Sequence, residues 1–336
     1  MSLCIKYKIG SLAVILTSYN HELYIEDSLE GILCQYRLPD QVIICDDASS
    51  DQTPEIIESF IRRFDLNWTF IRHNSNLGIT LNLLSALKLV QSEYIIALAG
   101  DDISLPNRCR LSEKMFHENP DCSAILLSGH SINSVGQFIA PIMAPNEPIS
   151  YFNFNIIKLG FPALPPVGLA YRAEVFTDFD LIAPLIKNED DYLTVKALCF
   201  GGIANSHYIS FYYRVHDNSA SSWIRKSSST EFHKKMHEDL INRIAHFSLW
   251  ISLVSGSTMI APELKFIFAE ALSRKIKLYE HFYSRGSLDL VSDSSVFLQC
   301  FNILCFRDFI QLFFGLKVYM HLRNLKGAII SRFCTS

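Results

Sequence analysis

The sequence lacks several features that would each define a class of protein. Its nine cysteines are scattered and form no C-x-x-C pair, so neither a zinc ribbon nor a dithiol redox motif is present. Several of them lie in apolar runs, where free cysteine behaves as a small hydrophobic residue, and this favours a reducing, cytoplasmic compartment. No apolar run reaches the ~18 uninterrupted residues of a spanning helix. The first residues, MSLCIKYKIGS, show no secretory signal pattern.

An excess of charge of either sign is also missing. The chain has 30 Lys and Arg against 34 Asp and Glu, a net charge of −4. Nucleic acid is therefore excluded as the main partner, because it usually requires a strongly basic face. Hydrophobic residues make up 49% of the 336 residues, so a large core can form. This length suggests one large domain, or a domain with an appendage.

The first hundred residues alternate between short apolar runs and amphipathic stretches. This alternation predicts a parallel, doubly wound α/β sheet. The predicted strands are Leu12–Leu16, Gln41–Cys45, Trp68–Ile71 and Tyr94–Ala99. The predicted helices between them cover residues 24–34, 53–64 and 80–90. Further on, the sequence predicts a strand at residues 122–128 and a proline-rich loop at residues 137–166.

Polar clusters follow three of the four predicted strands, at residues 17–20, 46–51 and 101–102. In a parallel sheet these strand ends share one edge, which is where open α/β sheets bind ligands. Each cluster alone could be a solvated turn or a helix cap. The adjacent carboxylates of Asp101 and Asp102 suit Mg²⁺, which is held by one or two carboxylates together with substrate phosphates. Together the clusters predict a metal–diphosphate site.

Six segments, in this order, resemble the signature of the family 2 glycosyltransferases, and among them the bacterial enzymes that add sugars to surface polysaccharides such as O-antigen. They are LTSYN (16–20), CDDASSD (45–51), HNSNLG (73–78), AGDD (99–102), NEDDYL (188–193) and YRVHDNSAS (213–221). The resemblance covers about residues 11–221. It implies the GT-A fold, a Rossmann-like nucleotide-binding mixed sheet flanked by helices. We expect a catalytic domain at 1–230, with a nucleotide-sugar half at 11–105 and an acceptor half at 106–230, followed by a helical C-terminal region at 231–336.

The resemblance also implies roles for individual residues at the nucleotide end of the site. A divalent metal, Mg²⁺ or Mn²⁺, would bridge the two phosphates of the donor. Many relatives carry a further Asp at the position of Ala99, so only two carboxylates of that motif remain here. The nucleotide contacts implied are Thr17, Tyr19, Asp47, Asn82, Asp101 and Arg214, and the metal ligands are Asp102 and His216.

The acids Glu189, Asp190 and Asp191 precede an apolar helical run. The helix dipole alone favours acids at a helix start, which is the structural interpretation. The resemblance implies that Asp190 is the general base, with Asp191 as the alternative if the alignment shifts by one residue. A base is needed because a sugar hydroxyl is a poor nucleophile. Attack opposite the leaving diphosphate would invert the anomeric centre.

The tail after about residue 230 lies outside the resemblance. Residues 233–247 and 263–282 have helical spacing, and residues 296–325 are rich in Phe, Leu and Ile. From residue 307 to the end there are five Lys or Arg and one acid. Apolar bulk beside basic residues is typical of a helix on an anionic membrane surface. The alternative is packing on the catalytic domain or on a second subunit in a homodimer.

These observations predict an inverting, metal-dependent glycosyltransferase at the cytoplasmic face of the inner membrane. Its donor would be a nucleotide diphosphate sugar, with UDP expected. Its acceptor would be a hydroxyl of a lipid-linked (undecaprenyl diphosphate) oligosaccharide in O-antigen, that is lipopolysaccharide, biosynthesis. A non-catalytic nucleotide-sugar or glycan-binding protein is the alternative from another class. A nucleotidyltransferase is disfavoured, because no glycine-rich basic loop for a triphosphate follows the first strand.

Overall fold

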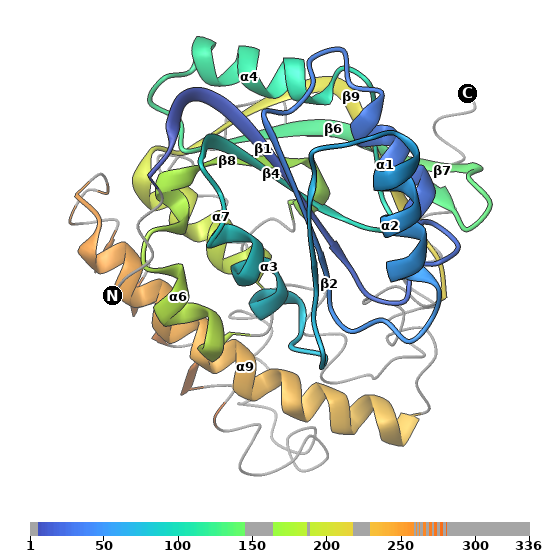
Figure 1. Ribbon diagram of the computed structural model, residues 1–336. Helices are drawn as coiled ribbons and strands as arrows, with labels where there is room; N and C mark the ends of the chain where they lie inside the picture. Colours follow the sequence, from blue (N-terminus) through green and yellow to red (C-terminus); the bar gives the residue numbers. More distant parts are fainter. Residues whose placement is uncertain are drawn as a thin grey trace, which may run out of the picture. The chain divides into compact units, whose positions relative to one another are not determined.

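The computed structural model of this protein describes residues 6–144, 164–186, 189–217 and 229–258, and part of the residues between 260 and 280 (Figure 1). The chain divides into two compact units. The first comprises residues 1–153, 163–216 and 257–260 and holds all of the predicted site residues. The second comprises residues 154–162, 217–256 and 261–336, and contains helix α9 (Ser229–Gly256). Within the described residues, no helix combines the length and the apolar character that spanning a bilayer would require.

The first unit is built on a mixed sheet with the strand order β3-β2-β1-β4-β8-β6-β9-β5, and β7 pairs with β6 at the side. Pairing is parallel among β1 to β4 and between β6 and β9, whereas β8, β5 and β7 pair antiparallel with their neighbours. The strands are β1 (Lys8–Ser18), β2 (Gln41–Asp46), β3 (Thr69–Arg72), β4 (Ser92–Ala99), β5 (Ile103–Ser104), β6 (Ala124–Asn133), β7 (Phe138–Ile142), β8 (Leu169–Arg172) and β9 (Ile203–Val215).

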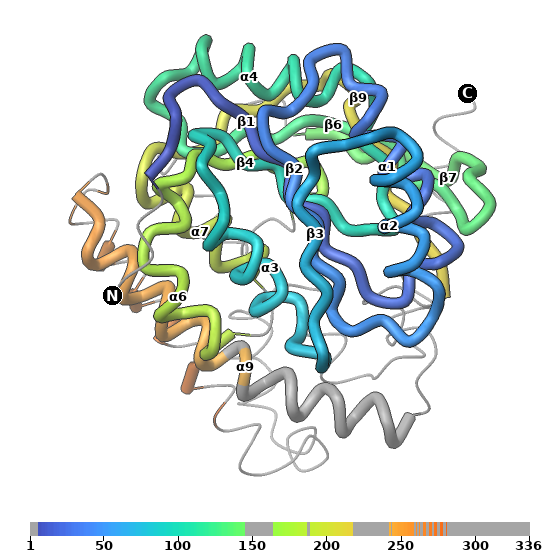
Figure 2. The backbone as a smooth tube through the Cα atoms, viewed as in Figure 1, coloured from blue at the N-terminus to red at the C-terminus, as the bar shows by residue number. Residues whose placement is uncertain are grey.

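The helices of this unit connect the strands. They are α1 (Ile25–Leu33), α2 (Thr53–Arg63), α3 (Ile79–Leu87), α4 (Arg108–Glu118), α6 (Phe179–Ile182) and α7 (Glu189–Phe200). Three short 3-10 turns add to them, η1 (Pro166–Gly168), η2 (Ala173–Phe176) and η3 (Ala183–Leu185). The α/β mixed sheet expected from the resemblance is confirmed, and so are the strand and helix predictions in the first hundred residues. Figure 2 shows β3 beside β2.

The predicted loop at residues 137–166 is wrong at its start, because β7 lies there. Gly136, with a φ of +83°, closes a tight turn after β6 in which its N–H donates to the carbonyl of Asn133. Strand β7 pairs only with β6 among the described strands, and much of it is exposed. Its sequence, FIAPI, is apolar but contains Pro141, and a proline within a run argues against a strand unless the strand lies at an edge. Strands β5, β8 and β9 also had no sequence prediction.

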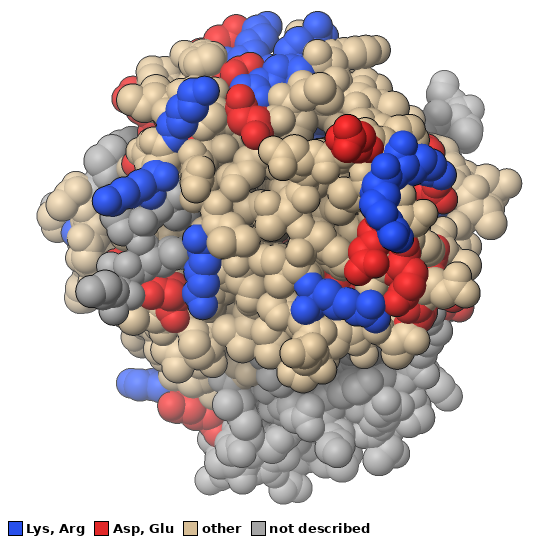
Figure 3. Space-filling model, in the orientation of Figure 1, with Lys and Arg blue, Asp and Glu red and all other residues tan. Residues whose placement is uncertain are grey.

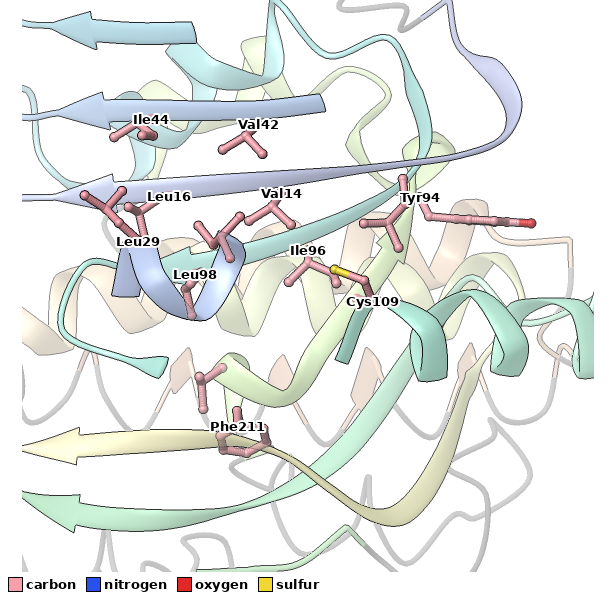
Figure 4. Close-up of a cluster of buried hydrophobic side chains, with 14 of the residues drawn as sticks. Val14, Leu16, Leu29, Val42, Ile44, Tyr94, Ile96, Leu98, Cys109 and Phe211 are labelled. Atoms are coloured by element: carbon pink, nitrogen blue, oxygen red, sulfur yellow. The ribbon is translucent and has the colours of Figure 1, made fainter. Parts of the chain in front are cut away.

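The main hydrophobic core lies on one face of the sheet (Figure 4). Because side chains alternate along a strand, Val14 and Leu16 of β1 face it together with Val42 and Ile44 of β2. Apolar residues of α1, α2 and α4, such as Leu29, complete this cluster. Helix α3 contacts β1 and β2, and its buried leucines lie outside the cluster, so it covers the opposite face. The sheet is thus a central layer with helices on both sides, and its strand ends are held rigidly.

Charged side chains do not form a continuous patch of one sign on the face drawn in Figure 3. Basic and acidic residues lie there in small mixed groups. This distribution agrees with the balanced composition of the chain.

Candidate active site

The carboxyl ends of β1, β2 and β4 lie next to one another. Strand β1 pairs in parallel with both neighbours, with Thr17 opposite Cys45 on β2 and Ala99 on β4. The chain runs outward from β1 through β2 to β3, and then returns to β4 on the other side of β1. Open α/β sheets bind their ligands at such a reversal of strand order. The predicted nucleotide edge therefore lies between β1 and β4.

The two adjacent carboxylates at the end of β2, Asp46 and Asp47, hold two different loops. Asp46 is fully buried and accepts hydrogen bonds from the backbone N–H and the hydroxyl of Ser49, at 2.8 and 2.5 Å. Asp47 accepts the backbone N–H groups of Leu77 and Gly78, at 2.7 and 2.9 Å. Asp47 thus fixes the loop before α3. Each of its oxygens keeps a further lone pair, and its contact with the nucleotide stays a prediction.

The other predicted nucleotide contacts of this half lie around the same strand ends. Thr17 is partly buried at the end of β1, and Tyr19, in the loop that follows, is 46% exposed. Asn82 is buried on α3, where its amide donates to the carbonyl of Cys45 at 3.1 Å. Its side-chain oxygen has no hydrogen-bond partner within the described part of the chain. The roles of Thr17, Tyr19 and Asn82 in nucleotide binding stay predictions.

Two segments more than a hundred residues apart in the chain meet at the paired acids. Nε2 of His216 lies 2.9 Å from Oδ2 of Asp101, and both side chains are buried. Burial opposes ionisation of Asp101, but the hydrogen bond with His216 and the nearby charge of His21 lower its pKa overall. Asp102 accepts the backbone N–H of Arg214 at 2.9 Å. Burial, and then the charge of Asp101, raise the pKa of Asp102 well above its usual range.

The side chain of Arg214 is held by the protein itself. Its Nε donates to the carbonyl of Asp101 at 3.0 Å, and an Nη donates to the carboxylate of Asp27 on α1 at 2.7 Å. Its guanidinium also lies over the ring of Tyr24, 4.9 Å from the centroid. These contacts join the start of α1 to the strand ends. The contact of Arg214 with the leaving diphosphate stays a prediction.

The predicted metal ligands fit a cation that is shared with the substrate. Among the described residues there is no group of three or more His, Cys, Asp and Glu that could enclose a metal ion. Mg²⁺ needs no such group, since it usually keeps waters and binds one or two carboxylates plus phosphates. Asp102 offers a carboxylate. Nε2 of His216 faces Asp101. Metal-bound histidines commonly have this arrangement, in which one ring nitrogen binds the metal and the other donates to a carboxylate. The donor set therefore suits Mg²⁺ or Mn²⁺.

A second group of acids opens α7. Glu189 and Asp190 are partly buried and Asp191 is exposed. Burial, followed by the charges of Glu189 and Asp191, raises the pKa of Asp190 well above its usual range. A carboxylate with a raised pKa takes up a proton more readily near neutral pH, as a general base must. This environment agrees with the predicted role of Asp190 as the base, and that role stays a prediction.

Helix α3 connects Asp47 at the nucleotide edge with the acids of α7. Its preceding loop is held by Asp47 through Leu77 and Gly78. One residue into the helix, the hydroxyl of Thr80 donates to Glu189 at 3.4 Å. The nucleotide edge and the acids of α7 are therefore tied to the same end of one helix.

Two residues near the strand ends had no sequence prediction, His21 and Arg108. Arg108 is buried at the start of α4. It donates to the hydroxyl of Ser104 at 3.1 Å and to the carbonyl of Val167, and so joins α4 to β5 and η1. Burial lowers its pKa to about 10. Gly168, which ends η1, has no room for a side chain, because a Cβ would lie 2.5 Å from a carbonyl of β6. A single charged residue after a turn gives no pattern that could have found this role.

An α/β sheet with acidic and polar residues at its reversal point, and a second acid group tied to the same region through α3, has the layout of a nucleotide-binding α/β fold. Comparison with known proteins identifies the family. Residues 13–179 match the profile of glycosyl transferase family 2, and the chain belongs to this family.

Relatives and a solved structure agree with this membership. A stretch of 187 residues is 26% identical to an uncharacterized glycosyltransferase of Mycoplasma pneumoniae, covering 55% of this chain and 60% of the relative. Another of 191 residues is 28% identical to the Staphylococcus aureus poly(ribitol-phosphate) beta-N-acetylglucosaminyltransferase TarS, covering 55% of this chain and 32% of TarS. The crystal structure of S. aureus TarS 1-349 in complex with UDP-GlcNAc has a TM-score of 0.58 at 19% identity, covering 90% of this chain and 81% of that one. This shows a shared fold. In the curated relatives, the match spans between 27% and 60% of the relative's length.

Proposed function

We propose that this protein is an inverting, metal-dependent glycosyltransferase. It transfers a sugar from a UDP-sugar to a hydroxyl of a lipid-linked oligosaccharide during assembly of a bacterial surface polysaccharide. One observation carries the proposal: Asp47 at the nucleotide edge and a separate acid group at the start of α7, with a raised pKa at Asp190, are both tied to the start of α3. Transfer needs both, one for the nucleotide of the donor and one for the attacking hydroxyl.

At the nucleotide edge, the chain positions the donor. Thr17, Tyr19 and Asp47 surround the nucleoside, and Asp101 lies toward the ribose or sugar. A divalent cation, when bound at Asp102 and His216, supplies positive charge that stabilises the leaving diphosphate. His216 keeps its orientation through its hydrogen bond with Asp101, so the ring need not reorganise during transfer.

At the start of α7, Asp190 accepts the proton of the attacking hydroxyl. The oxygen then forms a bond to the anomeric carbon as the bond to the diphosphate breaks on the opposite face, which inverts the configuration. The raised pKa of Asp190 favours proton transfer, because a general base works best when its pKa lies near the working pH. Glu189 holds Asp190 in place, since Thr80 in turn holds Glu189.

The choice of UDP rests on the fold neighbours, since TarS was crystallised with UDP-GlcNAc and with UDP. The acceptor proposal rests on the resemblance to surface-polysaccharide enzymes. TarS is named for poly(ribitol-phosphate), so a polyol phosphate chain is the second acceptor to test. We propose that the protein acts at the cytoplasmic face of the inner membrane, where it would meet a lipid-linked acceptor. A homodimer formed through the C-terminal region is the alternative.

Calorimetric titration with UDP and with GDP, each in Mn²⁺ and in EDTA, tests the donor side. We expect binding of UDP over GDP that requires Mn²⁺. Release of UDP from a panel of UDP-sugars, with lipid-linked oligosaccharide as acceptor, then tests the reaction. Binding without any turnover over this panel would favour the non-catalytic nucleotide-sugar-binding alternative. Binding of neither nucleotide by the folded protein would contradict the proposal.

A further inference from the structure

His21 lies at the predicted phosphate edge, although no motif assigns it a task. Its Nε2 is 3.8 Å from Oδ2 of Asp101, the same oxygen that His216 approaches to 2.9 Å. The two imidazole rings are edge to face, with centroids 6.4 Å apart. One carboxylate oxygen thus faces two histidines, one from the loop after β1 and one from the end of β9.

The backbone of His21 is fixed from both sides. Its N–H donates to the hydroxyl of Thr53 at 2.8 Å, and that hydroxyl donates to Asp51 at 2.6 Å. Its carbonyl accepts the N–H groups of Tyr24 and Ile25, both at 2.9 Å, where α1 begins. The ring therefore stands on a rigid base rather than on a free loop.

The turn after β4 has the shape needed to receive this ring. A Cβ at Gly100 would lie 2.8 Å from Nδ1 of His21 and 2.9 Å from the side chain of Ile25. Only glycine allows the backbone before Asp101 to come so close. Nδ1 of His21 is buried and has no hydrogen-bond partner among the described residues. The close fit and the short distance to Asp101 indicate a built contact between this loop and the paired acids.

We propose that His21 is a positioning residue that holds Asp101 when the nucleotide and its cation bind at the edge. This inference rests on the proposed function. Oδ2 of Asp101 meets Nε2 of His216 at 2.9 Å, and Nε2 of His21 is a second partner for the same oxygen after a small closure of the 3.8 Å contact. With Asp101 held by His21, His216 keeps the orientation in which it would bind the cation. Partners behind a metal ligand of this kind typically change metal affinity about 10–100-fold.

The variants H21Q and H21N test this role, because the Gln amide reaches the position of Nε2 and the Asn amide only that of Nδ1. Titration with UDP in Mn²⁺ should give H21Q an affinity within about threefold of the unchanged protein, and H21N an affinity weaker by about tenfold or more. In EDTA none of the three proteins should bind UDP, because binding requires the cation. The variant H130Q is the matched control, since His130 stacks on Tyr212 and contacts no described carboxylate.

Equal, Mn²⁺-dependent binding by H21N and the unchanged protein would overturn the inference and leave the proposed function intact. Loss of metal-dependent UDP binding in the unchanged protein would instead overturn the proposed function, and the inference with it. Thermal unfolding of each variant checks the fold. If H21N does not fold, T53V replaces it, because it keeps the imidazole but removes the hydroxyl that holds His21. T53V should weaken Mn²⁺-dependent UDP binding, and unchanged affinity would contradict the proposal.

Discussion

Among single side chains, Asp190 has the most direct consequence for activity. Replacing it by Asn keeps its size but removes the oxygen charge that accepts the proton. We expect transfer to fall by about 10²–10⁴-fold, the usual contribution of a general base, while UDP affinity is unchanged. Steady-state kinetics and calorimetry measure the two quantities. The matched control is D191N, which changes an exposed neighbour and should stay active. If D191N is inactive and D190N is active, the general base is Asp191 and not Asp190.

The pH profile tests the environment of the same carboxylate. Burial and the charges of Glu189 and Asp191 raise the pKa of Asp190, and a base works only when it is deprotonated. The rate kcat/KM should therefore fall, as the pH is lowered, at a higher pH than for an ordinary exposed Asp.

Removing the charge of Glu189 in E189Q lowers the pKa of Asp190, so the acidic limb should shift to lower pH. If the acidic limb of the kcat/KM profile does not shift in E189Q, a group other than Asp190 controls that limb. The exposed Glu58 on α2 gives the control E58Q, which should leave the profile unchanged.

At the scale of helices and strands, Arg108 joins three segments of the fold, which are α4, β5 and η1. Replacing it by Met keeps much of the apolar contact with Phe211 but leaves the buried carbonyl of Val167 without its donor. We expect a loss of about 1–3 kcal/mol in the free energy of unfolding, the cost of one such buried group. Denaturant unfolding measures it. On the same helix, R110M changes an exposed arginine and should stay within about 0.5 kcal/mol. Equal stabilities would contradict the role of Arg108.

The same segments show how far the sequence predicts this fold. Strands β1 to β4 were predictable, because each is a buried apolar run that ends in polar residues. Strands β5 and β9 were not, since β5 has two residues and the buried and exposed positions of β9 come in irregular blocks instead of the strict alternation that marks a strand. Yet the pairing of Ile103 with Tyr212 is what brings the predicted His216 to the predicted Asp101.

The direction of a side chain depends on contacts that are distant in sequence. Arg214 was predicted beside the nucleotide, but its hydrogen bonds to Asp27 and Asp101 depend on where α1 begins. His21 had no signal for the same reason. A lone histidine in a loop gains a partner only after β1 and β4 are paired, and one chain without relatives aligned to it shows no pattern for such a contact.

At the scale of the whole chain, the basic, apolar C-terminal residues are predicted to contact an anionic membrane surface. Residues 296–336 lie outside the described part of the structure, so the prediction rests on their sequence. Three of their cations, Lys317, Arg323 and Lys326, lie within ten residues of one another and have no acid among them. Each Lys or Arg near an anionic membrane contributes about 1 kcal/mol, so this group adds about 3 kcal/mol to binding.

Reversing these three charges, in K317E/R323E/K326E, should weaken sedimentation with vesicles containing phosphatidylserine by more than about a hundredfold, because the attraction becomes repulsion. Binding to neutral phosphatidylcholine vesicles should change little, since apolar contacts alone act there. The control K88E/K114E reverses two exposed cations of the first unit and should bind like the unchanged protein. Sedimentation of the triple variant with phosphatidylserine vesicles that equals that of the unchanged protein would contradict the membrane proposal. The alternative, packing on a second copy, would then appear as a lower mass of the triple variant in sedimentation equilibrium.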